Sequence, residues 1–160
     1  MKANHLWKTG TLRALAPIAL VAGSLLGVHG SAAALTTEHG SSCKPYGNSA
    51  TSGLYSYVSG VYNYSSGSMG VACPVVRTIA TATTGYSVWV DGSASTGTTT
   101  CTLYSYSYAD AYLGSISFSA TGVFDRLLTL PLSQVPAYSS QVVYCYVPVN
   151  GSLYDVEPVQ

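Results

Sequence analysis

Short runs of β-branched and aromatic residues alternate with clusters of Gly, Ser, Asn and Asp after residue 52, and no segment there has an apolar stripe at helical spacing. This pattern predicts strands over Leu54–Tyr64 (with a break at Gly60), Val71–Ala80, Tyr86–Asp91, Thr99–Tyr108, Ser115–Ala120, Val123–Leu130, Val142–Val147 and Leu153–Val156. Short strands at regular spacing are typical of packed antiparallel sheets. We therefore predict an all-β domain over residues 53–160, a two-sheet antiparallel β-sandwich of jelly-roll-like type.

Two segments carry turn signals. Asp91-Gly92 and residues 93–98 separate two predicted strands, and Asn150-Gly151 separates the last two. Asn and Gly both accept the positive φ that a two-residue turn between antiparallel strands requires. The Asn150-Gly151 pair therefore predicts that the last two strands form an antiparallel hairpin.

Alternation within the predicted strands assigns side chains to opposite faces of a sheet. The face that carries Cys101 is opposite to the face that carries Tyr104 and Tyr106. In two further strands, at residues 71–75 and 143–147, valines share a face with a cysteine. Cysteines on aliphatic faces indicate a disulfide-bearing interior.

The first 34 residues have the order of a secretory signal peptide. Basic residues precede an apolar run over residues 14–27, and the small residues at 31–34 suit a signal peptidase. The apolar run of about 14 residues is too short to anchor the chain across a hydrocarbon layer of roughly 30 Å. We predict cleavage after Ala34 and a secreted or periplasmic location, with residues 35–52 forming a polar, flexible N-terminal arm.

Four cysteines follow the predicted cleavage site: Cys43, Cys73, Cys101 and Cys145. In an exported protein, an even number of well-separated cysteines predicts two disulfides. Three pairings are open, and we favour Cys43–Cys73 with Cys101–Cys145. A zinc site is the alternative, but such sites use close ligand pairs, there is no Cys-x-x-Cys, and His39 is the one histidine after residue 34.

Removal of the signal peptide makes the chain slightly acidic. Three basic residues remain against six acidic ones, a formal net charge of −3: Lys44, Arg77 and Arg126 against Glu38, Asp91, Asp110, Asp125, Asp155 and Glu157. Without a basic stripe we expect no nucleic-acid partner. Low charge combined with 14 tyrosines is the reverse of a disordered composition. No second apolar span follows, so we expect no membrane span after cleavage.

Tyrosines at alternate positions form the one pattern that indicates a binding function. They are Tyr55 and Tyr57, then Tyr104, Tyr106 and Tyr108, then Tyr144 and Tyr146. If these strands are neighbours, such a face is an aromatic platform that stacks on sugar rings or contacts a protein, and Trp89 joins it. The alternative is structural, because tyrosine fits a half-buried pleated surface well. The candidate ligand-binding residues are Tyr104, Tyr106, Tyr144, Tyr146 and Trp89.

Catalytic chemistry has little support in the sequence. Asp155 and Glu157 share a face of the last predicted strand, and two carboxylates suit glycoside hydrolysis or calcium binding. However, no Asp-x-Asp-x-Asp-Gly loop and no Gly-x-Ser-x-Gly segment is present, and His39 lies in the predicted arm. We therefore expect solvated surface acids, no catalytic residue, no metal, no cofactor and no enzyme activity.

The segments 71–77 (VACPVVR), 101–103 (CTL) and 144–148 (YCYVP) resemble uncharacterised small secreted β-rich proteins of Gram-negative bacteria. The resemblance implies a periplasmic or extracellular disulfide scaffold and carries no site residue. We predict an exported, non-enzymatic binding or structural module of the cell envelope or extracellular space. The alternatives are a carbohydrate-binding module that uses an exposed Tyr/Trp face, with a polysaccharide partner, and an inhibitor or adhesin-like module that binds an extracellular protein.

Overall fold

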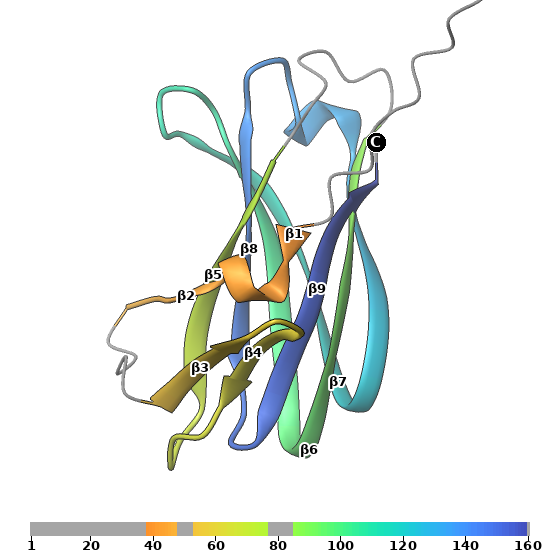
Figure 1. Ribbon diagram of the computed structural model, residues 1–160. Coiled ribbons are helices and arrows are strands. Elements are labelled where there is room, and N and C mark those ends of the chain that lie inside the picture. Colours follow the sequence, from red (N-terminus) through yellow and green to blue (C-terminus); the bar gives the residue numbers. More distant parts are fainter. Residues whose placement is uncertain (1–37, 48–52, 77–84, 160) are drawn as a thin grey trace, which may run out of the picture. The chain divides into compact units, whose positions relative to one another are not determined.

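A computed structural model describes residues 38–47, 53–76 and 85–159 (Figure 1). The described chain is built of antiparallel strands with two single turns of 3-10 helix. In chain order the elements are β1 Glu38–His39, η1 Gly40–Ser42, β2 Lys44–Pro45, β3 Leu54–Tyr57, β4 Gly60–Asn63, β5 Met69–Val75, β6 Tyr86–Tyr106, β7 Tyr112–Leu130, η3 Leu132–Gln134, β8 Ser140–Val147 and β9 Gly151–Val159. The prediction of an all-β fold is confirmed.

The long strand β6 organises the sheet, whose order is β2-β5-β8-β6-β9-β4-β3, with β1 beside β9 and β7 beside β6. Residues 86–94 of β6 lie between β9 and residues 122–130 of β7. Residues 100–106 lie between β8 and residues 112–120 of β7. The sheet therefore has a β9 half (β1, β3, β4, β9) and a β8 half (β2, β5, β8), and β6 and β7 continue through both (Figure 1).

The bend between the two halves replaces the turn predicted over residues 91–98. The register shifts where β6 passes from Ala94 to Thr99, and Gly97 and Gly122 adopt φ angles of +78° and +68° there. Glycine accepts these angles without the strain that a Cβ would add. Hydroxyls of Ser95 and Thr96 donate to the carbonyl oxygens of residues 150 and 149, which ties the bend to the turn before β9. The chain does not reverse at the predicted turn. Instead, β6 and β7 both pass there between the β9 half and the β8 half.

The hairpin predicted for the last two strands is wrong. A turn does form at Asn150-Gly151, with φ of 57° at Asn150 and a bond from the Gly151 amide to the Pro148 carbonyl. However, β8 pairs with β5 and β6, whereas β9 pairs with β1, β4 and β6. The turn chemistry correctly indicates a chain reversal, but β6 lies between the two strands that the turn connects.

The core lies between the two halves and draws side chains from both. It includes Val88, Val90, Leu128 and Val156 of the β9 half and Val71, Leu103, Val143 and Val147 of the β8 half, all almost fully buried. Burial of each such side chain contributes about 1.5–3 kcal/mol. The predicted alternation is confirmed, because Cys101 and Leu103 are buried while Tyr104 and Tyr106 lie on the outer face.

Both favoured disulfides form. Cys43 is bonded to Cys73, Cys101 is bonded to Cys145, and all four cysteines belong to the core. Cys101 and Cys145 are also directly opposite each other in the β6–β8 ladder. The alternative of a zinc site at these cysteines is therefore excluded, since none is free.

The described part of the predicted flexible arm, residues 38–47, is built into the sheet. Strand β1 pairs with β9 and β2 pairs with β5, while the Cys43–Cys73 bond fixes the segment between them. Composition alone predicted a loose segment because it does not show these long-range pairings. The predicted signal peptide, residues 1–34, lies outside the described residues. Within the described part of the chain, no helix is long and apolar enough to cross a membrane.

Candidate functional site

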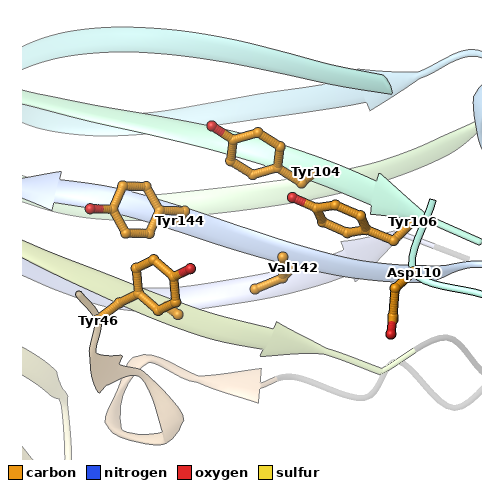
Figure 2. Close-up of a pocket in the computed structure, with 7 residues that line it drawn as sticks. Tyr46, Tyr104, Tyr106, Asp110, Val142 and Tyr144 are labelled. Atoms are coloured by element: carbon orange, nitrogen blue, oxygen red, sulfur yellow. The ribbon is translucent and has the colours of Figure 1, made fainter. Parts of the chain in front are cut away.

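An open groove of about 580 Å³ lies on the outer face of the β8 half (Figure 2). Its lining is dominated by tyrosine and contains one carboxylate: Tyr46, Ala72, Tyr104, Tyr106, Asp110, Val142 and Tyr144. The groove thus combines flat aromatic rings, phenol hydroxyls and one negative charge. We call it the tyrosine groove.

One wall of the tyrosine groove comes from β6. Tyr104 and Tyr106 are two residues apart on the outer face, and their rings stack with centroids 6.2 Å apart and an angle of 26° between planes (Figure 2). Tyr112 of β7 packs its ring edge against both, with centroids at 6.5 and 6.1 Å. Val142 of β8 is opposite Tyr104 in the ladder and leaves room between the rings of neighbouring strands. The wall is therefore a fixed aromatic row.

The opposite wall is formed by Tyr144 of β8 and Tyr46, which follows β2. Their rings meet edge to face at 5.3 Å (Figure 2). The Tyr46 amide donates to the Gly70 carbonyl at 2.9 Å, which holds Tyr46 beside β5. Gly70 also leaves space for Tyr144, because a Cβ at residue 70 would meet the Tyr144 hydroxyl. A glycine on β5 thus allows the Tyr144 ring to lie across that strand.

The hydroxyl of Tyr144 remains protonated across the physiological range. Partial burial, a side-chain hydrogen bond with Tyr146 and the nearby Tyr46 and Tyr104 phenols raise the pKa of Tyr144 to about 12. A neutral phenol both donates and accepts a hydrogen bond. Tyr144 can therefore bond to a hydroxyl group of a ligand while its ring contacts the apolar part of the same ligand.

The end of the groove is closed by the loop between β6 and β7, which positions Asp110 (Figure 2). Ser107 organises this loop. Its amide donates to the Ala111 carbonyl at 2.8 Å, and its hydroxyl accepts bonds from the amides of Ala109 and Ala111. Asp110 adopts a φ of 58°, which Asp tolerates better than most residues. The loop thus presents a carboxylate, a strong hydrogen-bond acceptor, at the end of the aromatic rows.

A row of hydroxyl groups extends the same face beyond the tyrosines. Thr102 lies opposite Tyr144 in the β6–β8 ladder and bonds to Ser117 of β7 at 2.7 Å. Thr100 bonds to Ser119 in the same way at 2.9 Å. The outer face of the β8 half therefore has an aromatic part, the tyrosine groove, and a hydroxyl-rich part beside it where Thr100 and Thr102 of β6 bond to serines of β7.

The structure brings together three of the five predicted ligand-binding residues, Tyr104, Tyr106 and Tyr144, in the groove. Tyr146 does not line the groove but contacts Tyr144, with ring centroids 5.4 Å apart. Trp89 lies in the β9 half, opposite Leu127 of β7 and Glu157 of β9, and does not line the groove. Trp89 is on an outer face, but it does not join the tyrosines in one platform, because β6 changes halves between them.

Sequence reasoning missed four lining residues, Tyr46, Ala72, Asp110 and Val142, of which Tyr46 and Asp110 carry polar groups. Tyr46 lies in the segment predicted to be a flexible arm, and its position depends on the Cys43–Cys73 bond and the β2–β5 pairing. Asp110 belongs to a loop, and alternation within strands does not predict on which side of the sheet a loop residue lies. The tyrosine pairs at residues 104–106 and 144–146 are the signal in the sequence that indicates this aromatic face, although Tyr146 does not line the groove.

Carboxylates gather on the outer face of the β9 half, away from the groove. Asp91 of β6 lies directly opposite Asp125 of β7 on one side and Asp155 of β9 on the other, and Glu157 is opposite Trp89. Burial, a hydrogen bond with Asp125 and the negative charges of Asp125, Glu157 and Asp155 raise the pKa of Asp91 to about 6. The predicted pair Asp155–Glu157 is thus part of a row of like charges across three strands.

These carboxylates line neither the tyrosine groove nor the pocket beside β3 and β4. Across the described residues, no group of three or more His, Cys, Asp or Glu side chains is arranged to hold a metal ion. The side chain of His39 lies outside what the structure describes. The groove, with its rings, hydroxyls and single carboxylate, is therefore suited to binding through stacking and hydrogen bonds.

No protein-family model and no curated protein matches the sequence. Among solved structures, the chain is similar to the carbohydrate-binding module CBM36 in complex with calcium and xylotriose. The two share 19% sequence identity with a TM-score of 0.44, and the match covers 78% of this chain and 100% of that chain.

Proposed function

We propose that the protein is an exported, non-enzymatic β-sandwich module that binds a glycan in the tyrosine groove. The two halves of the folded sheet are the layers of the sandwich, and they enclose one core. Two disulfides within so small a domain suit an oxidising compartment outside the cytoplasm. The proposal includes the predicted signal peptide and the resemblance to secreted bacterial proteins.

A single observation supports glycan binding most directly: four tyrosines from three separate segments converge on one open groove of about 580 Å³. Sugar rings offer flat apolar faces surrounded by hydroxyl groups. Aromatic rings cover the faces, and phenols, threonines and a carboxylate bond to the hydroxyls. The groove supplies these groups together, with Asp110 at its end and the Thr102–Ser117 pair beside it.

The purely structural interpretation of the tyrosines has less support. None of the four groove tyrosines belongs to the buried core cluster, and Tyr46 is 60% exposed. Cross-strand aromatic pairs contribute about 0.2–1 kcal/mol each to a sheet, but that role does not require an open groove lined from three segments. Tyr104, Tyr106 and Tyr144 are half-buried, and rings held in such fixed contact leave little side-chain entropy to lose when a ligand binds.

The experiment is a binding titration of the oxidised protein. Calorimetry with soluble oligosaccharides and retention on insoluble polysaccharides would compare the wild type with Tyr104→Ala, Tyr144→Ala and the control Tyr138→Ala, which removes a tyrosine that is 77% exposed and does not line the tyrosine groove. Each groove variant is expected to bind about tenfold more weakly, a loss of about 1.4 kcal/mol, while the control binds like the wild type. Equal binding by all four proteins, or no binding of any glycan, would contradict the proposal.

A protein partner is the second candidate, because β7 offers a free edge. Among the described strands, β7 pairs with β6 alone over its 19 residues, and it exposes Val123 and Leu127. A long edge strand of this kind can accept a further strand from another chain. Amide hydrogen exchange along β7, measured with and without a captured partner protein, would show protection in this case and none if the partner binds elsewhere.

A further inference from the structure

A second aromatic pocket lies beside the β3–β4 hairpin. It encloses about 420 Å³ and is lined by Tyr57, Ser59, Gly60, Val61, Tyr62, Tyr64, Ser152 and Tyr154. Its residues come from β3, β4, β9 and the adjoining loops, so it shares neither a residue nor a strand with the tyrosine groove. We call it the hairpin pocket.

The close approach of the hairpin to β9 creates this pocket. The two-residue turn at Val58 and Ser59 leads into Gly60, which has a φ of 127°. A Cβ at residue 60 would meet the carbonyl oxygen of Leu153 and the backbone of Tyr154. Glycine is therefore required there both for its backbone angle and for contact with β9, and this contact places the hairpin tyrosines beside Tyr154.

Hydrogen bonds fix the phenols of the hairpin pocket. The Tyr57 hydroxyl donates to the Tyr64 hydroxyl at 3.0 Å, and the Tyr62 hydroxyl donates to the side-chain oxygen of Asn150 at 3.1 Å. The Tyr154 hydroxyl shares a bond of 3.0 Å with Ser93 of β6. The rings of Tyr62 and Tyr64 are also in contact, with centroids 4.1 Å apart. The aromatic surface is thus held in place before any ligand arrives.

The tyrosines that line the hairpin pocket are fixed but not buried. Tyr57, Tyr64 and Tyr154 are 46%, 53% and 39% exposed, and none belongs to the core cluster. The hairpin is anchored to the core by other residues, since Val61 and Asn63 are fully buried. The exposed rings are therefore available for contact with a ligand, because stability of the hairpin does not depend on covering them.

We propose that the hairpin pocket is a second glycan site and that the domain is bivalent for polysaccharide. The ligand class follows from the lining, which combines four phenols with two serines and has no charged side chain. Rings and hydroxyls without charge match a neutral, hydroxyl-rich ligand. The inference takes its ligand class from the proposed function of the tyrosine groove, and it adds a separate site with separate residues.

Two sites on different strands would make the domain bivalent, which a single site cannot do. Binding at one site makes binding of the same polysaccharide at the other effectively intramolecular, which raises apparent affinity without new contacts. The two sites can also hold two polysaccharide chains and cross-link them. Loss of cross-linking in a variant that still binds short oligosaccharides at the groove therefore reports on the hairpin pocket.

The test uses the oxidised protein with soluble neutral polysaccharides: hydroxyethyl cellulose, arabinoxylan, galactomannan and glycogen. Light scattering would follow cross-linking, and affinity electrophoresis in gels containing each polysaccharide would follow retention. The hairpin variant is Tyr57→Ala with Tyr154→Ala, the groove variant is Tyr104→Ala with Tyr144→Ala, and the control is Tyr138→Ala. Thermal unfolding followed by circular dichroism selects variants that remain folded, and single substitutions replace any double variant that does not.

We expect the wild type and the control to scatter with at least one polysaccharide. The hairpin variant should be retained at least tenfold more weakly and should not scatter, while it still binds short oligosaccharides in calorimetry. If the hairpin variant behaves like the control and the groove variant loses binding, the second site is refuted and the proposed function stands. If the groove variant behaves like the control and the hairpin variant loses binding, the hairpin pocket is a glycan site and the groove is not. Absence of binding by the wild type would refute both.

Discussion

Substitution of Asn63 is expected to be among the most destabilising single changes in the domain. Asn63 is fully buried at the end of β4. It begins an Asn-Tyr-Ser sequence, the acceptor pattern for N-glycosylation, which is usually found at exposed sites. Its side-chain amide nitrogen lies 2.9, 2.9 and 3.0 Å from the carbonyl oxygens of Gly67, Val147 and Pro148, which share its two N–H donors. Its side-chain oxygen accepts bonds from the amide and hydroxyl of Ser65. One side chain therefore connects the hairpin to the turn between β8 and β9.

The magnitude follows from the hydrogen bonds that Asn63→Ala removes. The bond to the Val147 carbonyl is buried, and a buried polar group that loses a partner costs about 1–3 kcal/mol. The Pro148 carbonyl loses one bond but keeps the bond from the Gly151 amide. Together with the lost contacts of Ser65, the expected loss is about 2–4 kcal/mol, a large fraction of the 5–15 kcal/mol typical of a small domain. Asn63→Asp should lose a similar amount at pH 7, because a carboxylate cannot donate to carbonyls.

Urea unfolding of the oxidised protein would measure this loss. Ser65→Ala is the matched control, because it removes a hydroxyl of the same network but leaves the bonds that the Asn63 amide donates to backbone carbonyls, and it should cost about 1 kcal/mol or less. Acidification should partly restore Asn63→Asp relative to Asn63→Ala, since a protonated carboxyl donates one bond. A loss below about 1 kcal/mol for Asn63→Ala would refute the assigned role of the network.

Three further predictions concern the disulfide, the carboxylate row and the groove. Cys101→Ala with Cys145→Ala opens a loop with a sequence separation of 44 residues and should lower the free energy of unfolding by about 4 kcal/mol in calorimetry; an unchanged thermal midpoint would contradict this. Because the pKa of Asp91 is about 6 when folded and about 3.9 when unfolded, its protonation stabilises the fold below pH 4 and that contribution is lost as the pH rises through 6. Between pH 4.5 and 7.5 the free energy of unfolding of Asp91→Asn should therefore fall by about 1–2 kcal/mol less than that of the wild type, a figure that allows for solvent screening. Urea unfolding across this pH range would measure it, and an equal fall in both proteins would contradict the prediction. Gly70→Ala should displace the Tyr144 phenol and lower glycan affinity about three- to tenfold with little change in thermal midpoint, whereas Gly67→Ala, at which an added Cβ meets nothing within 4 Å and which lies outside the groove lining, should bind like the wild type; unchanged calorimetric affinity for Gly70→Ala would exclude this positioning role.

Much of the fold could be predicted from local pattern. Alternation placed Cys101 and Cys145 on aliphatic faces and the neighbouring tyrosines on the opposite faces, because a strand repeats every two residues whatever its partner is. The predicted pairs Cys43–Cys73 and Cys101–Cys145 are those that form. These features depend on the strand itself and on which face is buried.

Features that depend on contacts far apart in the sequence could not be predicted. The Asn150-Gly151 turn gave the place of a reversal but not the partner of either strand, which the central position of β6 decides. Trp89 and Tyr104 are both on outer faces of β6, yet the bend at Ala94–Thr99 puts them in different halves. Tyr46 reaches the groove through the β2–β5 pairing and the disulfide next to it. The side of the sheet on which a residue lies is thus a global property.

The most direct test of glycan binding in the tyrosine groove is an NMR titration that observes the tyrosine rings one by one. With assigned ring signals of the oxidised protein, a bound oligosaccharide should shift Tyr46, Tyr104 and Tyr144, which line the groove, and leave Tyr138 unchanged. The shifts should saturate together with one dissociation constant. Saturable binding that leaves these three rings unchanged would contradict the account, as would the absence of any shift across the panel of glycans.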